Sequence, residues 1–297
     1  MKVSDVKVFG IIGAGQMGAG IAQVAAAKGY KVLLLDVSKD LVEKSKGKLG
    51  AVLQKQVDKG KMTADDRATL LANIEPVDNA TAFAKADIVV EAATENTDIK
   101  LKLFRAADEV MPKGAILASN TSSISITKLA ASTSRPDKVI GMHFMNPVPL
   151  MKLIEIVRGL QTSDDTYALV KALSEVLGKV VITSNDEPGF IVNRMLIPFL
   201  NEACFGLQEG LGTIEDIDKG AKLGLNHPMG PLELADLVGL DTLLFIADVL
   251  HREFGEDKYR PATLLRNMVA AGWLGRKSGK GFYTYQGADK VPTMLTR

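Results

Sequence analysis

A glycine-rich turn is the sequence feature that most constrains the fold of this chain. The pattern Gly-x-Gly-x-x-Gly at residues 13–18 follows an apolar run at residues 6–12 and opens an alanine-rich stretch at residues 18–27. Strand, glycine turn and helix in this order permit a tight turn, close approach of a ligand to the backbone, and close helix-on-strand packing. Because the positive end of a helix favours anions, we expect a phosphate-containing ligand at Gly13, Gly15, Gln16, Met17 and Gly18.

Asp36 favours a dinucleotide as the ligand of this turn. It ends the next strand-like run, 18 residues after Gly18, where an acid can accept hydrogen bonds from both ribose hydroxyls. The same charge repels a 2′-phosphate, so NAD is favoured over NADP, although Lys39 nearby leaves NADP open. The alternative is a glycine turn with a purely structural purpose.

Strand-like and helical segments alternate through the first part of the chain. The strand-like runs are residues 6–12, 31–35, 87–91, 115–118 and 180–183, and the helical stretches are residues 18–27, 41–61, 98–110 and 164–177. This alternation predicts a Rossmann-like, doubly wound α/β sheet. Two further runs, 139–144 and 153–157, are too close in sequence for a parallel return, so we expect them to add an antiparallel hairpin.

Strand signals largely vanish after Pro188. Glycines and prolines there separate helical stretches at residues 189–211, 213–222, 231–254 and 261–271. We therefore expect two domains, a dinucleotide-binding domain at residues 1–187 and an all-helical domain at residues 188–297. The tail from Gln286 to Arg297 shows no pattern that indicates a role.

Charge, cysteine content and hydropathy exclude several classes of protein. A net charge of +1, from 36 Lys plus Arg against 35 Asp plus Glu, argues against nucleic acid as a partner. Cys204 is the only cysteine and the three histidines share no ligand spacing, so neither a disulfide nor a metal site is expected. No run reaches the roughly 18 apolar residues of a membrane span, and the N-terminus lacks a signal sequence, so we expect a cytoplasmic protein.

His143 and Glu155 form the candidate acid/base pair. They lie at equal sequence distances from Pro149, so an antiparallel hairpin centred there places them opposite each other on one face. A carboxylate beside an imidazole fixes its tautomer and stabilises the imidazolium. The alternative is a surface or structural His/Glu pair.

Location favours the catalytic interpretation of this pair. Open α/β sheets bind ligands beyond the carboxyl ends of their strands, where the sequence places Asp36, Glu95, Asn120, Ser122 and His143. The polar run at residues 119–123 follows one such strand and supplies hydroxyl and amide groups. Capping of a helix that begins near Ile124 is an equally good explanation for some of these side chains.

Motifs in both halves of the chain carry a resemblance to one enzyme family. The chain resembles the NAD-dependent L-3-hydroxyacyl-CoA dehydrogenases, and most closely the short single-function bacterial 3-hydroxybutyryl-CoA dehydrogenases, up to about Tyr285. The motifs are GAGQMGAGIA at 13–22, EAATEN at 91–96, SNTSSISIT at 119–127, GMHFMNPVPLMKLIEIVRG at 141–159, PGFIVNR at 188–194, HPMGPLELAD at 227–236 and GWLGRKSGKGFY at 272–283. One departure is Met145, where the family usually has an aromatic residue.

The resemblance implies a role for each site residue. His143 would be the general acid/base with Glu155 as its partner, Ser122 would bond the substrate 3-oxygen, and Asn193 would reach the reacting group. Further contacts with the dinucleotide are implied for Glu95, Lys100, Asn120 and Asn146, and with coenzyme A for Lys55 and Lys59. The two lysines are four residues apart, so a merely solvated helix face is an equal alternative.

The resemblance also implies an acyl-CoA substrate and a homodimer. The helical domain would bind substrate and dimerise, with apolar stretches at residues 197–207 and 237–250 as the expected subunit contact. Two alternatives to this function remain at the level of sequence. One is a sugar-acid or other β-hydroxyacid dehydrogenase, and the other is a non-catalytic dinucleotide-binding protein.

Overall fold

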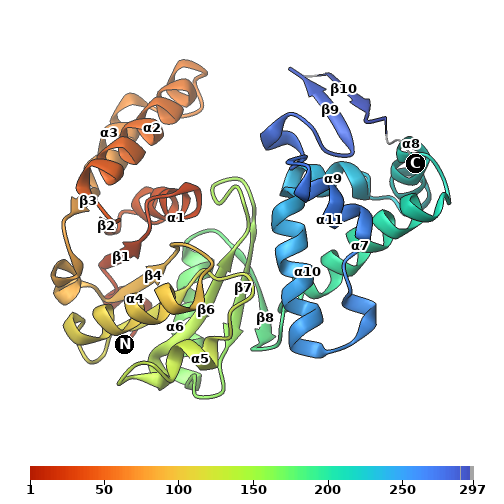
Figure 1. Ribbon diagram of the computed structural model, residues 1–297. Coiled ribbons are helices and arrows are strands. Elements are labelled where there is room, and N and C mark those ends of the chain that lie inside the picture. The colour runs from red at the N-terminus through yellow and green to blue at the C-terminus, as the bar shows by residue number, and fades with distance from the viewer. Residues whose placement is uncertain (288, 295–297) are drawn as a thin grey trace. The chain divides into compact units, whose positions relative to one another are not determined.

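The computed structural model describes residues 1–287 and 289–294 of the chain. The chain divides into two compact units, Met1–Glu187 and Pro188–Arg297 (Figure 1). The first unit contains a single mixed sheet with the strand order β3–β2–β1–β4–β5–β6–β7–β8. Its strands are β1 (Val8–Ile12), β2 (Lys31–Leu35), β3 (Ile74–Val77), β4 (Ile88–Glu91), β5 (Ile116–Ser119), β6 (Val139–Phe144), β7 (Leu153–Arg158) and β8 (Val180–Asn185).

Parallel pairing dominates the sheet, as the alternation of strands and helices predicts. Every neighbouring pair of strands is parallel except β6 and β7. The central strands are buried along nearly their whole length because helices cover the sheet, which explains their continuous apolar runs. These findings confirm the doubly wound α/β architecture.

Six α-helices accompany the sheet among the described residues of the first unit. They are α1 (Gln16–Ala27), α2 (Lys39–Asp58), α3 (Ala64–Ala72), α4 (Thr97–Val110), α5 (Ile126–Ala130) and α6 (Asp164–Val176). Side-chain oxygens just before five of these helices accept backbone N–H groups that have no partner within the helix, which fixes where those five helices begin. The capping residues are Ser38, Thr63, Asn96, Ser125 and Ser163.

The antiparallel hairpin of β6 and β7 is confirmed with its predicted register. Gly141 pairs with Val157, and His143 pairs with Glu155. Strand β8 then pairs with β7 in a parallel direction. The sheet therefore continues beyond the hairpin to an eighth strand at its edge.

One part of the first unit was not predicted from the sequence. Residues 64–77 form α3 and the short strand β3, which pairs with β2 at the opposite edge of the sheet. Figure 1 shows α2 and α3 as an adjacent pair next to β2 and β3. Pro76 lies within β3 and weakens the strand signal, but an edge strand tolerates a proline because one of its sides has no partner strand.

The second unit is mainly helical. Its α-helices are α7 (Val192–Glu209), α8 (Ile214–Lys219), α9 (Pro231–Val238), α10 (Leu240–Phe254) and α11 (Thr263–Ala270). They enclose a core of their own, in which Leu200, Leu232, Leu243 and Phe282 are fully buried. No helix in the described part of the chain is long and apolar enough to cross a membrane.

Two expectations for the second unit are corrected. It is not wholly helical, because β9 (Tyr283–Gln286) and β10 (Asp289–Pro292) form an antiparallel hairpin. The expected helix at residues 231–254 is two helices, since Gly239 adopts φ +99° between them. Residues 197–207, expected to belong to the subunit contact, place Ile197, Cys204 and Leu207 in the core of the unit, and the contact itself stays a prediction.

The hairpin gives structure to the tail that shows no pattern in the sequence. Thr293 donates its amide to Phe282, which ties the end of the hairpin to the start of β9. Residues 288 and 295–297, which belong to this tail, lie outside the described residues.

Candidate active site

Each glycine of the turn between β1 and α1 is required for a different reason. Gly13 adopts φ +102°, and a Cβ there would lie 2.5 Å from the Ala92 carbonyl oxygen. A Cβ at Gly18 would lie 1.8 Å from the carbonyl oxygen of Gly13, so helix and turn can pack closely only with glycine. A side chain at either position would therefore force the neighbouring backbone to move.

Gly15 differs from its two neighbours in the motif. Its backbone has φ −67° and ψ −170°, which any residue adopts. Apart from Gly15 and its neighbours along the chain, no heavy atom of residues 1–287 and 289–294 lies within 4 Å of a Cβ placed there. Neither packing nor conformation explains this glycine. Open space at the N-terminus of α1 fits a ligand that approaches the backbone closely, which favours the dinucleotide over a purely structural turn.

Asp36 lies directly beside the glycine turn. Its Oδ2 accepts a hydrogen bond from the Ala14 amide at 2.6 Å, and its Oδ1 accepts one from the Val37 amide at 2.7 Å. Each carboxylate oxygen can accept more than one hydrogen bond, so the ribose interaction remains compatible with these contacts. The carboxylate therefore also fixes the shape of the turn.

A buried ion pair lies at the carboxyl end of β4. The Lys100 ammonium, 1% exposed, contacts both carboxylate oxygens of Glu91 at 2.7 Å and Glu95 Oε2 at 3.4 Å. The Ser119 hydroxyl and the Ala93 amide also donate to Glu91. Since Lys100 lies beneath the surface with two acidic partners, its contact with the dinucleotide stays a prediction.

Glu95 organises the polar run that follows β5. Its Oε1 accepts hydrogen bonds from the hydroxyls of Thr121, Ser122 and Ser123 and from the amides of Ser122 and Ser123, at 2.6–3.1 Å. Burial alone would raise the pKa of Glu95, but Lys100 and these hydrogen bonds outweigh burial and lower the pKa. A charged Glu95 therefore holds the backbone around Ser122.

Capping contacts coexist with this arrangement, as the alternative interpretation of the polar run allows. The Thr121 hydroxyl accepts a hydrogen bond from the Ile124 amide at 2.9 Å. Asn120 links the run to the hairpin, because its Oδ1 accepts the Phe144 amide at 2.9 Å. Because Phe144 follows His143 in the chain, this hydrogen bond ties Asn120 to the backbone next to His143.

His143 and Glu155 form a buried pair. Their side chains meet with His143 Nδ1 2.9 Å from Glu155 Oε2, and they are 7% and 0% exposed. The interpretation as a surface pair is excluded by this burial. A carboxylate at Nδ1 orients the ring, and proton exchange with a ligand then falls to Nε2.

Lys179 supports the loop that joins β6 to β7. Its ammonium donates to the carbonyl oxygens of Val148 at 2.5 Å and Met151 at 2.8 Å, and burial lowers its pKa. Asn146, expected to contact the dinucleotide, precedes Pro147 in this loop through a cis peptide bond. Sequence patterns did not identify Lys179 or Glu91, although each is a charged residue beside an apolar strand.

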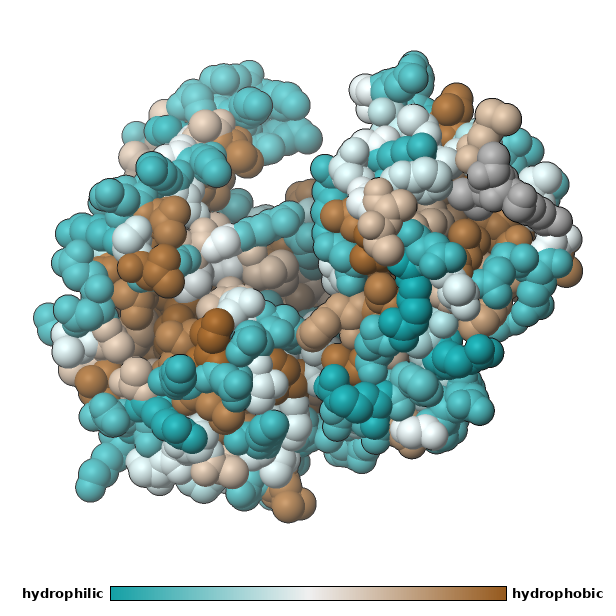
Figure 2. Space-filling model, viewed as in Figure 1, coloured by the Kyte–Doolittle hydropathy of each residue, from teal (hydrophilic) through white to brown (hydrophobic). Residues whose placement is uncertain are grey.

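The remaining predicted residues belong to helices α2 and α7 and the cap of α2. Lys55 and Lys59 lie exposed at the end of α2, and the surface over α2 and α3 is mostly hydrophilic (Figure 2). Both coenzyme A contact and a solvated face remain compatible with that placement. Asn193 lies in α7 of the second unit and is 8% exposed.

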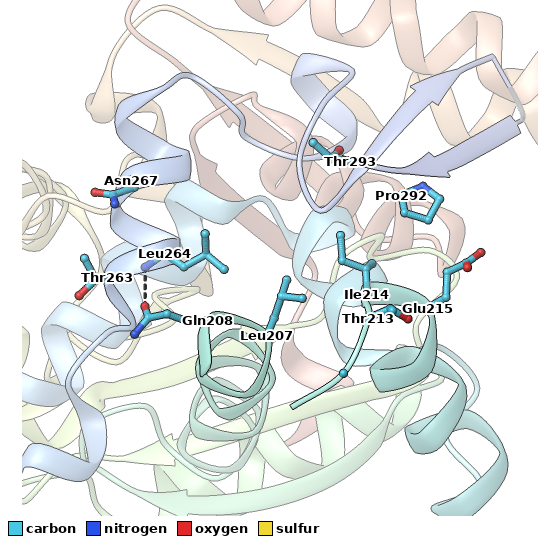
Figure 3. A pocket seen from close by; sticks show the side chains of 11 residues that line it. Leu207, Gln208, Thr213, Ile214, Glu215, Thr263, Leu264, Asn267, Pro292 and Thr293 are labelled. Atoms are coloured by element: carbon cyan, nitrogen blue, oxygen red, sulfur yellow. Dashed lines mark hydrogen bonds between the residues drawn. The ribbon is translucent and has the colours of Figure 1, made fainter. Parts of the chain in front are cut away.

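A separate pocket of about 830 Å³ opens in the second unit (Figure 3). None of the predicted site residues lines it. Two of its polar groups serve the fold, since Gln208 accepts the Leu264 amide and Thr213 caps α8.

Taken together, the fold and the site have the features of a dinucleotide-dependent dehydrogenase with a buried His/Glu pair. The chain matches two family models, described as the NAD binding domain of 3-hydroxyacyl-CoA dehydrogenase over residues 8–187 and its C-terminal domain over residues 189–285. The chain thus belongs to the NAD-dependent 3-hydroxyacyl-CoA dehydrogenase family. The resemblance found in the sequence motifs is confirmed.

Individual relatives match nearly the whole chain. A probable 3-hydroxybutyryl-CoA dehydrogenase of Deinococcus radiodurans is 53% identical, with coverage of 93% of this chain and 99% of the relative. The 3-hydroxybutyryl-CoA dehydrogenase of Bradyrhizobium diazoefficiens is 50% identical, with coverage of 97% and 98%. A solved structure of (S)-3-hydroxybutyryl-CoA dehydrogenase from Ralstonia eutropha has a TM-score of 0.92 at 53% identity and covers 95% of this chain and 99% of that one.

Proposed function

We propose that this chain interconverts (S)-3-hydroxyacyl-CoA and 3-ketoacyl-CoA with NAD(H), with 3-hydroxybutyryl-CoA and acetoacetyl-CoA as the substrate pair. The observation that carries the proposal is the buried His143–Glu155 pair at the carboxyl end of β6, in a chain whose glycine turn fits a dinucleotide. Family membership and the relatives named above support the same substrate class.

The residues around the glycine turn fit NAD. Open space at Gly15 admits the pyrophosphate, the N-terminus of α1 supplies N–H donors, and Asp36 would accept the ribose hydroxyls. Bound NAD would supply the hydride acceptor, and NADH the hydride donor. The further contacts proposed for the dinucleotide are those of Gln16, Met17, Glu95, Lys100, Asn120 and Asn146.

His143 would move the proton that accompanies hydride transfer. Neutral His143, held at Nδ1 by Glu155, would accept the 3-hydroxyl proton at Nε2 during oxidation. During reduction the imidazolium would donate this proton to the 3-oxygen. Glu155 would orient the ring throughout this exchange, because its carboxylate lies 2.9 Å from Nδ1.

Ser122 would bond the 3-oxygen from the neighbouring segment. The Ser122 and Ser123 amides, which donate to Glu95, keep the backbone of Ser122 in place, and the Ser122 hydroxyl would turn from Glu95 to donate to the 3-oxygen. Asn193 would bond the reacting group, and Lys55 and Lys59 would contact the phosphates of coenzyme A. Alanine variants of Asn193, Lys55 and Lys59 test these three roles through the KM for acetoacetyl-CoA.

The experiment that tests the proposed function is acetoacetyl-CoA reduction by NADH in the His143→Ala variant. General acid/base assistance contributes about 10² to 10⁴ in rate, so kcat should fall by at least 10² while the Kd for NADH stays within about twofold. Full kcat in this variant would overturn the acid/base role. Turnover of free hydroxy acids tests the sugar-acid alternative. Turnover of C4 to C10 3-ketoacyl-CoA substrates measures the preferred acyl chain length, and comparison of NADH with NADPH tests the cofactor.

A homodimer formed through the second unit is part of the proposal. Large apolar side chains remain exposed there, among them Met195, Leu211, Leu223, Leu225, Leu237 and Phe245. A subunit contact would remove some of this apolar surface from water. Light scattering after size exclusion measures the mass, and a monomer at micromolar concentration would contradict the dimer.

The cytoplasmic location stays a prediction that cell fractionation tests.

A further inference from the structure

A carboxylate at the end of β8 holds the segment that follows Ser122. Asp186 is the residue after β8, and its Oδ2 accepts hydrogen bonds from the Ser125 hydroxyl and the Thr127 amide, both at 2.7 Å. Its Oδ1 accepts the Ile126 amide at 2.8 Å. Both carboxylate oxygens of Asp186 are therefore engaged by one short stretch of chain.

This contact fixes the start of α5. The first N–H groups of a helix have no partner within the helix, and a negative charge at this end is favourable. The Ser125 hydroxyl, which donates to Asp186, also accepts the Lys128 amide at 3.1 Å. Asp186 thus orients the capping residue of α5 as well as its first two amides.

The segment with Ser122 is consequently held at both ends by carboxylates. Glu95 binds residues 121–123 on the side of β5, and Asp186 binds residues 125–127 on the side of α5. Charge-assisted hydrogen bonds of this kind are about twice as strong as neutral ones. Only Ile124 lies between the two anchored stretches, so a shift at Asp186 reaches Ser122 within a few residues.

We propose that Asp186 is a positioning residue for Ser122. Its carboxylate fixes the C-terminal end of the segment at residues 121–127 and so sets where the Ser122 hydroxyl meets the 3-oxygen of the substrate. The inference rests on the proposed function, because it requires that Ser122 bonds this oxygen. Displacements of about 1 Å in a positioning contact can lower turnover by about 10².

The Asp186→Asn variant tests the proposal in the full-length enzyme. The amide keeps the shape of the side chain but presents an NH2 group to a backbone N–H, so the contact is broken on one side. We expect kcat/KM for acetoacetyl-CoA to fall about 10- to 100-fold, with the Kd for NADH within about twofold of the parent value. Glu187→Gln removes the exposed neighbouring acid and is the matched control, with kcat/KM within twofold.

A double-mutant cycle with Ser122→Ala separates positioning from a general structural role. If Asp186 acts through Ser122, Asp186→Asn should lower kcat/KM less than about twofold in the Ser122→Ala background. An equal loss in both backgrounds would overturn the inference. Unchanged kcat/KM in Ser122→Ala alone would instead remove the proposed role of Ser122, so the two failures are distinguishable.

A second variant keeps the test available if Asp186→Asn does not fold. Asp186→Glu retains the charge and moves the carboxylate by one methylene group. We expect it to fold and to bind NADH as the parent does. We also expect a lower kcat/KM than the parent, and this loss should disappear in the Ser122→Ala background. Parental kcat/KM in this variant, with an unchanged melting temperature, would contradict the need for the observed geometry.

Discussion

Alanine substitution of two glycines in the same turn should affect different properties of the protein. Gly18→Ala should lower the thermal stability, and Gly15→Ala should weaken NADH binding. In Gly18→Ala the new Cβ lies 1.8 Å from the Gly13 carbonyl oxygen, whereas van der Waals contact needs roughly 3.5 Å. Helix α1 or the turn must move, and overpacking of this kind costs about 1–3 kcal/mol of folding free energy. The first unit has the size at which 1 kcal/mol lowers the melting temperature by about 2–4 °C, so we expect a loss of roughly 2–12 °C.

Gly15→Ala should leave the fold intact and weaken NADH binding. Its φ of −67° suits alanine, and the Cβ points into open space. Alanine is a poorer N-cap than glycine, which lowers the stability of the fold, but it also reduces the entropy of the unfolded chain, which raises the stability. Each effect is about 1 kcal/mol or less, so the two largely cancel. The Cβ occupies the position proposed for the pyrophosphate, so we expect the Kd for NADH to rise at least about tenfold, equivalent to about 1.4 kcal/mol.

Thermal unfolding and NADH fluorescence titration measure the two effects on the same protein samples. Parental NADH affinity in Gly15→Ala would refute the reasoning, because the open space would then not be occupied by the cofactor. A large fall in melting temperature for Gly15→Ala would show that Gly15 serves packing instead. An unchanged melting temperature in Gly18→Ala would contradict the steric argument.

Three further predictions concern the charged groups of the site. Glu155→Gln keeps the shape of the side chain but removes the carboxylate that holds His143 Nδ1, so kcat for acetoacetyl-CoA reduction should fall by about 10² or more with the Kd for NADH unchanged, and full kcat would count against the pair. Because the pKa of Glu95 is lowered in the folded protein, its charge stabilises the fold above the pKa of about 4.3 that Glu has in the unfolded chain. This stabilisation is lost as pH falls through the lower pKa of the folded protein. Glu95→Gln should therefore flatten the fall in melting temperature below about pH 4.3, and a parallel curve would contradict this. Lys179→Met leaves two loop carbonyls without their donor, so we expect a lower melting temperature and faster hydrogen exchange at residues 146–151. The control is Lys152→Met, because Lys152 is exposed. Equal hydrogen exchange in both variants would contradict the role of Lys179 in supporting the loop.

Local patterns explain why some elements could be predicted from the sequence and others could not. The hairpin register followed from spacing alone, since His143 and Glu155 lie equally far from its centre and pair as expected. Strand β3 shows no such pattern, because it is short, contains Pro76 and is held by its pairing with β2. The break at Gly239 was missed because glycine alone does not show whether it adopts a positive φ, as it does here at +99°.

The site divides in the same way. Sequence by itself identified the residues that stand at the carboxyl ends of strands, because strand alternation fixes that edge. It did not show which partners those residues meet, because these come from distant parts of the chain. Glu91 meets Ser119, which is 28 positions away, and Asp186 meets Ser125, which is 61 positions away.

The sequence by itself thus determined the dinucleotide-type turn, the doubly wound sheet and the pairing of His143 with Glu155. Each of these follows from residues close in sequence or from the regular geometry of strands. Only the tertiary structure decided that His143 and Glu155 are buried, that Glu95 holds the segment with Ser122, and that Asp186 anchors its far end. The physical reason is that burial and buried hydrogen bonds arise from packing between distant segments, which no local pattern specifies.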